Sequence, residues 1–184
     1  MDAIFEYVQK NVRYEQVYLE YGGIIPNPPD LILTRMYGDC KDYSLMMYLM
    51  AKSAGLNVHL ALCYRGRGKK FYKELPVSQF NHMILYFKDN NKNYWYDGTN
   101  RSGICGITSA DLINQDALVL KQDSSKIIQI SESEQNQIRI SGRLIPNMSD
   151  LHGKIKIELN SQYAIDFFFL SYYLNKPDLY DYIV

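Results

Sequence analysis

The stretch GDCKDYSLMMYLMAKSAGL, residues 38–56, decides the fold. Between residues 40 and 54 its apolar side chains occupy several faces of a helix, which predicts a buried central helix. Asp39 is a suitable N-cap, because its carboxylate can accept hydrogen bonds from the free N–H groups of the first turn. Gly55 predicts the end of the helix, since glycine readily adopts the left-handed conformation of a C-terminal cap.

Cys40 stands at the start of this predicted helix and is the candidate nucleophile. The helix dipole and the unpaired N–H groups at a helix N-terminus favour a thiolate, the reactive form of cysteine. The same N–H groups could donate to the oxyanion of a tetrahedral intermediate. A lone cysteine is more often inert filling, so Cys40 gains weight only if a base accompanies it.

Two later segments provide a candidate base and a candidate acid that orients it. Residues 82–87 and 94–97 are strand-like, and the polar run 89–93 between them predicts a hairpin turn. His82 begins one arm and Asp97 ends the other, so antiparallel pairing would bring them side by side. We predict that His82 is the base for Cys40 and that Asp97 orients the imidazole.

The rest of the chain predicts an α+β fold. An N-terminal helix is expected within residues 2–21, with Ile4, Phe5, Val8 and Val12 on one face, before a proline-rich loop and a short helix at 30–36. Further predicted elements are strands at 57–64, 117–121, 126–130, 137–144 and 154–159 and a helix at 163–174. The polar run SESEQNQ indicates that the main domain spans 1–130, with a C-terminal extension at 131–184.

Bulk composition excludes several classes of function. The chain has 184 residues, 47% hydrophobic and 22% charged, and its 20 basic and 20 acidic residues cancel, which disfavours nucleic acid and anionic membranes as partners. No apolar run is long enough to predict a membrane span, and the first residues lack the pattern of a secretory signal. The three cysteines form no CxxC pair, so neither a disulfide framework nor a zinc site is predicted. No acidic loop in the sequence has the ligand spacing of a calcium site, so calcium is not predicted.

The order Cys, His, Asp within GDCKD, FNH and YWYDGT resembles the transglutaminase-like superfamily. The likeness extends over about residues 12–121. Within the superfamily, the sequence most resembles a bacterial branch whose catalytic domain follows a DUF3857-type β domain. The resemblance implies a papain-like core, with the nucleophile at the N-terminus of a central helix that packs on an antiparallel β-sheet. It also implies thiol-dependent acyl transfer on amides, with Cys40 as nucleophile, His82 as base and Asp97 as orienting acid.

The sequence departs from this family in two places. The usual upstream glutamine, an oxyanion donor, is missing, and the neighbourhood of Gln16 does not match, so Tyr14 in the VRY segment is the substitute candidate. The chain also lacks the preceding β domain, while the region after about residue 137 resembles the start of a C-terminal β domain. We therefore expect a fragment of a longer protein, whose parent the resemblance places in the periplasm or at the cell surface of a bacterium.

The resemblance implies two kinds of function. The first is hydrolysis by a peptidase or amidase acting on a protein or cell-wall peptide, or transglutamination where a primary amine replaces water. The alternative is a catalytically idle domain that binds a partner protein. Neither requires a metal or an organic cofactor.

Several other residues have a simple structural interpretation. Cys63 and Cys105 are predicted to be structural, His59 to lie on a sheet surface, and His152 has no partner motif. The basic loop with Arg65, Arg67, Lys69 and Lys70 is most simply a solvated turn; a functional version would flank the cleft and attract an acidic substrate. The aromatic run 163–173 is interpreted as a packing face, which would cover a missing domain if the chain is a fragment.

Overall fold

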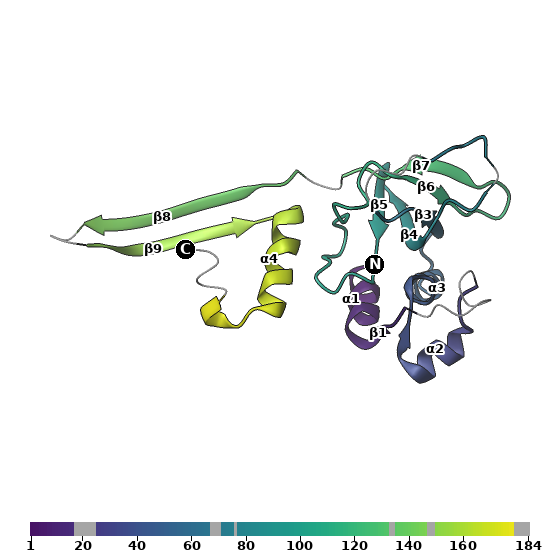
Figure 1. The fold of residues 1–184 in the computed structure, drawn as a ribbon, viewed down its shortest axis with the longest axis horizontal. Helices are drawn as coiled ribbons and strands as arrows, with labels where there is room; N and C mark the ends of the chain where they lie inside the picture. Colours follow the sequence, from purple (N-terminus) through teal and green to yellow (C-terminus); the bar gives the residue numbers. More distant parts are fainter. Residues whose placement is uncertain (17–24, 67–70, 76, 133–134, 147–149, 179–184) are drawn as a thin grey trace. The chain divides into compact units, whose positions relative to one another are not determined.

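The chain forms two compact units, Met1–Ser133 and Glu134–Val184. The computed structural model describes residues 1–16, 25–66, 71–75, 77–132, 135–146 and 150–178. The first unit combines helices with an antiparallel sheet, and the second contains a long hairpin followed by helix α4 (Figure 1). The predicted α+β class is therefore confirmed. Within the described ranges, no helix has both the length and the apolar character needed to cross a membrane.

A five-stranded sheet forms the centre of the first unit, in the order β5-β4-β3-β6-β7 with every neighbouring pair antiparallel. Alternate side chains of β4 enter two different apolar clusters: Leu85 joins one, while Ile84 and Tyr86 join the other. The sheet is therefore covered on both faces. Its strands are β3 (Val58–Cys63), β4 (His82–Asp89), β5 (Lys92–Tyr96), β6 (Asp116–Val119) and β7 (Lys126–Gln129).

Three helices gather on one side of this sheet (Figure 1): α1 (Asp2–Asn11), α2 (Pro29–Arg35) and α3 (Cys40–Ser53). Val8 of α1, Met47 of α3 and Leu85 of β4 belong to one buried cluster, and each is fully inaccessible to solvent. The predicted central helix is confirmed, with Asp39 as its N-cap and Gly55 in the left-handed conformation (φ +78°) just beyond its end.

The N-terminal helix is shorter than the predicted range 2–21. It ends at Asn11, and Val12 is already extended. The two residues of β1 (Arg13–Tyr14) then pair in parallel with β2 (Tyr37–Gly38). This pairing with a distant segment overrides the local helical signal, although the predicted apolar face holds, since Phe5, Val8 and Val12 are buried. Residues 17–21 of the prediction lie outside the described residues.

In the second unit, β8 (Ile138–Pro146) pairs with β9 (Leu151–Leu159), and α4 (Ser161–Tyr173) follows. The register places Ile140 opposite Ile157, with Ile155 opposite Gly142 on the same face, and the isoleucines are exposed. The interpretation of residues 163–173 as a packing face is not supported within this unit. Five aromatic side chains of α4 remain exposed: Tyr163, Phe168, Phe169, Tyr172 and Tyr173.

We expect Met47→Ala to destabilise the first unit by about 2–5 kcal/mol, because it removes a fully buried side chain between α3 and the sheet. Urea denaturation followed by the fluorescence of Trp95, the only tryptophan and itself buried, measures this unit. Leu33→Ala, at an exposed position of α2, is the control and should change the unfolding free energy by less than about 1 kcal/mol. Equal effects of the two substitutions would contradict the proposed core.

Candidate active site

The N-terminus of α3 is fixed by two carboxylates on either side of Cys40. Asp39 accepts from the backbone N–H of Lys41 at 3.0 Å, and Asp42 accepts from the backbone N–H of Asp39 at 3.2 Å, which completes a capping box. Lys41 also forms a buried ion pair with Asp39. Cys40 is therefore the first residue of a rigidly capped helix, where N–H groups have no intrahelical acceptor.

Asp42 additionally holds the proline-rich loop. Its carboxylate accepts from the backbone N–H of Asn27 at 2.7 Å and from the Asn27 side chain at 2.9 Å. A Cβ atom at Gly38 would lie 2.5 Å from the Asp42 side chain, so only glycine fits there. The GDCKD motif thus encodes a close-packed unit around the thiol.

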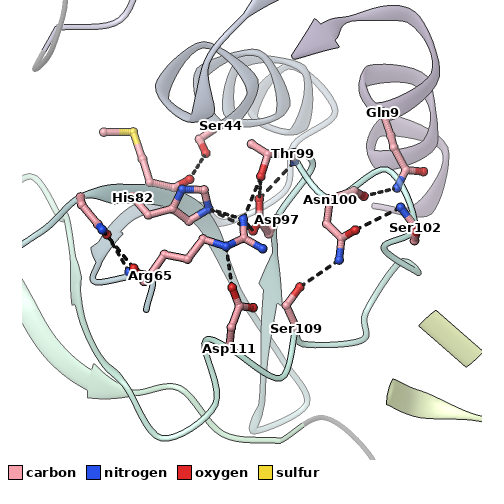
Figure 2. Close-up of polar contacts among 12 residues, drawn as sticks. Gln9, Ser44, Arg65, His82, Asp97, Thr99, Asn100, Ser102, Ser109 and Asp111 are labelled. Carbon is pink, nitrogen blue, oxygen red and sulfur yellow. Dashed lines mark hydrogen bonds and ion pairs between the residues drawn. The ribbon is translucent and has the colours of Figure 1, made fainter. Parts of the chain in front are cut away.

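His82 is the first residue of β4 and pairs with Cys63 of β3. Asp97 follows β5, whose Tyr96 pairs with Leu85 of β4. The hairpin therefore brings His82 and Asp97 together, and His82 Nε2 lies 3.0 Å from Asp97 Oδ2 (Figure 2). The structure brings these two predicted site residues into direct contact.

Ser44 joins the helix to the strand that carries His82. Its hydroxyl donates to the carbonyl oxygen of Met83 at 2.9 Å, beside His82 (Figure 2). Ser44 lies one helical turn after Cys40, on the same face of α3. This bond helps to set the position of Cys40 along β4, and Cys40 raises the pKa of His82.

Opposing influences act on the pKa of His82. Burial is the largest and lowers the pKa, but the charge of Asp97, its hydrogen bond, and the hydrogen bond and charge of Cys40 raise it to about 9. Burial of Asp97 raises the pKa of its carboxyl group, whereas His82 and Arg65 lower it, with a net pKa of about 2. The environment therefore favours an imidazolium beside an ionised carboxylate.

Arg65 is the site residue that the sequence interpretation missed. Its Nη1 lies 2.9 Å from Asp97 Oδ2, and its Nε lies 2.6 Å from Asp111 Oδ2 (Figure 2). The interpretation as a solvated turn is therefore wrong for Arg65, because two carboxylates hold its guanidinium. Asp111 carried no motif signal, and residues 67–70 of the basic loop lie outside the described residues.

Tyr14, the predicted oxyanion donor, is half-buried in β1 and packs edge-on against Tyr43 with 6.0 Å between ring centres. Burial raises its pKa to about 12, and the negative charges of Cys40, Asp39 and Asp97 add to the effect. Tyr14 pairs with Gly38 of β2, two residues before Cys40, so it lies beside the start of α3. The phenol keeps its proton at neutral pH and can donate a hydrogen bond.

The other cysteines and histidines lie apart from this group. Cys63 is fully buried in β3, and burial raises the pKa of its thiol. Burial and Asp2, whose carboxylate accepts from Cys105 Sγ at 3.1 Å, raise the pKa of Cys105 to about 12. His59 stacks on Tyr86. Among the residues that the structure describes, no group of three His, Cys, Asp or Glu side chains has an arrangement suited to a metal.

The family model of the transglutaminase-like superfamily matches residues 1–98, and the chain belongs to this superfamily. Its first unit has the papain-like, transglutaminase-like core expected for that family. A comparison with curated proteins gives no significant match.

One similar solved structure is a "putative protease" from Parabacteroides distasonis, with 14% sequence identity and a TM-score of 0.49. The alignment covers 79% of this chain and 29% of the other chain, so the present chain spans under a third of that protein's length.

We expect Asp97→Asn to lower the pKa of His82, because the substitution removes the negative charge that favours the imidazolium. Proton NMR of the imidazole signals measures this directly, since the chain has only three histidines. Asp123→Asn, at an exposed position, is the control. An unchanged His82 titration in a folded Asp97→Asn variant would contradict the electrostatic role of Asp97.

Protonation of His82 should also make folding stability depend on pH. The folded-state pKa of His82, about 9, exceeds the ordinary value of 6.5. The imidazolium therefore stabilises the folded state fully below pH 6.5, and this contribution is lost as the pH rises through 9. The difference in unfolding free energy between the wild type and His82→Gln should shrink across this range in urea titrations. His152→Gln, at an exposed site in the second unit, should show no such trend.

Proposed function

We propose that this chain is a thiol-dependent enzyme that transfers acyl groups from amides, with Cys40 as nucleophile, His82 as general acid and base, and Asp97 as the residue that orients His82. The observation that carries this proposal is the position of the His82 imidazole, whose Nε2 lies 3.0 Å from Asp97 Oδ2 and whose pKa is raised by both Asp97 and Cys40. A thiol at a capped helix N-terminus beside such an imidazole favours a thiolate–imidazolium pair.

In the proposed reaction, Cys40 Sγ attacks the amide carbonyl carbon and forms a tetrahedral intermediate. The C–N bond then breaks, His82 gives its proton to the departing amine, and a thioester remains on Cys40. Water attacks the thioester, passes a proton to His82, and releases the carboxylic acid with the regenerated thiol. A primary amine in place of water gives a new amide.

The oxyanion would be stabilised by the backbone N–H of Cys40 and by the hydroxyl of Tyr14. The position of Cys40 at the first residue of α3 supports the first donor. The pairing of Tyr14 with Gly38, two residues before Cys40, supports the second donor, because it brings the tyrosine beside the start of α3. Burial keeps its hydroxyl protonated, with a pKa of about 12.

We favour hydrolysis of a protein or peptide, as a peptidase or amidase, over transfer to an amine. A cell-wall peptide is the more specific substrate that we propose, and it would place the parent protein in the periplasm or at the surface of a bacterium. The C-terminal unit is proposed to be the start of a further β domain.

A second candidate function is protein binding without catalysis. It is favoured by the apolar face of the β8–β9 hairpin, where Ile140, Ile155 and Ile157 are between 48% and 68% exposed. Large exposed apolar faces mark interaction sites. In this case the group around Cys40 would be assembled but inactive.

Alkylation by iodoacetamide tests the thiolate. The pKa values of Cys63 and Cys105 are raised, so labelling at pH 6 should occur at Cys40 alone, as read by peptide mass mapping. His82→Ala should slow this labelling at least about tenfold, because it removes the cation that stabilises the thiolate. Cys105→Ser is the matched control and should label like the wild type. Labelling of Cys40 that follows the pH dependence of a free thiol would favour the binding function.

Glutamine-containing and cell-wall peptides, with and without a labelled primary amine, separate hydrolysis from transfer. Released acid indicates hydrolysis, and incorporated label indicates transfer. Lack of reaction with every amide, together with binding of a partner protein that survives Cys40→Ala, would overturn the enzymatic proposal.

A further inference from the structure

The carboxylate of Asp97 is held by four hydrogen-bond donors. Its Oδ1 accepts from the backbone N–H of Thr99 at 3.1 Å and from the Thr99 hydroxyl at 2.6 Å. Its Oδ2 is shared by His82 Nε2 at 3.0 Å and Arg65 Nη1 at 2.9 Å. Of these donors, only Arg65 brings a permanent positive charge.

Arg65 is itself tightly positioned. Asn81, directly before His82, accepts from the Arg65 backbone N–H at 2.6 Å and donates to the Arg65 carbonyl at 3.0 Å. At the other end, Nε donates to Asp111 at 2.6 Å and Nη1 donates to the Thr99 hydroxyl at 3.2 Å. The guanidinium therefore spans from Asp111 to Asp97 with little freedom to turn.

The same guanidinium lies close to the imidazole. Arg65 Nη1 is 3.4 Å from His82 Nε2, and both atoms point at Asp97 Oδ2 (Figure 2). When Nε2 donates to Asp97 it cannot accept from Arg65, so the two groups meet as neighbouring donors. A cation at this distance opposes the positive charge of the imidazolium and partly neutralises Asp97.

We propose that Arg65 is a positioning residue that fixes Asp97 against His82 and, by its charge, sets the upper end of the pH range in which His82 stays protonated. This inference rests on the proposed function, in which the protonated imidazole is the acid that releases the amine. Cys63 of β3 is paired with His82, Cys40 approaches from α3, and Asp97 and Arg65 follow β5 and β3. Asp111 lies behind the guanidinium, and Tyr14 of β1 interacts with Cys40, Asp97 and Arg65.

Two consequences distinguish this role from simple structural support. Removing the positive charge of Arg65 should raise the pKa of His82 and shift the alkaline limb of the pH–rate profile to higher pH. Loosening Asp97 should reduce kcat with little change in KM, since Arg65 acts through Asp97 and not on substrate. A residue that only braces the loop after β3 would move neither the titration nor the limb.

The test is NMR titration of His82 in the full chain with Arg65→Gln, Arg65→Lys and Asp111→Asn. We expect Arg65→Gln to raise the His82 midpoint by about one pH unit, and Arg65→Lys to leave it within a few tenths of a unit. Asp111→Asn should shift it downward, because the guanidinium charge is then less compensated. Arg35→Gln, an exposed arginine in α2, is the matched control and should match the wild type.

Activity, once detected, adds the second readout: kcat should fall about tenfold or more in Arg65→Gln, with an alkaline limb shifted like the NMR midpoint. An unchanged or lowered His82 midpoint in folded Arg65→Gln would overturn the proposal. If Arg65→Gln fails to fold, Asp111→Asn is the deciding variant, because it changes only the charge of a partly exposed side chain. A His82 midpoint in Asp111→Asn that is raised or unchanged would then overturn the proposal. The titration does not require an active enzyme. An inactive wild type would therefore contradict the proposed function but leave the test of Arg65 intact.

Discussion

The docking of α3 on β4 is the constraint on which the rest of the site depends. The helix is buried along most of its length by Tyr43, Met46, Met47 and Ala51, so apolar packing fixes its distance from the sheet but not its position along β4. The hydrogen bond from Ser44 to the Met83 carbonyl fixes this position along β4, because any other position would leave the buried Ser44 hydroxyl without a partner, at a cost in free energy. With α3 in this register, the start of the helix and the start of β4 meet.

Much of the fold could be predicted from local signals. The cap at Asp39, the left-handed Gly55 and the alternation in β3 and β4 are encoded within a few residues, so the central helix and the sheet were predictable. The triad candidates were predictable because Cys40, His82 and Asp97 each stand at the boundary of such an element. Their catalytic roles remain a proposal.

Features that depend on distant partners were not predictable. The end of α1 is set by the pairing of Arg13 with Tyr37, and nothing in the local apolar pattern marks it. The part played by Arg65 depends on Asp111, which is 46 residues away and carried by a loop without a motif. A glycine-bearing basic stretch has the composition of a solvated turn, and only the tertiary structure shows that Arg65 turns inward to Asp97.

The close contact between Gly38 and Asp42 also limits how this site can diversify. Any side chain at position 38 would displace the carboxylate that caps the helix and holds Asn27, so one substitution would disturb three segments together. The backbone ahead of the thiol is therefore closed to variation. New substrate preferences could arise only from surfaces that do not share this carboxylate, such as the loops that follow β3 and β5.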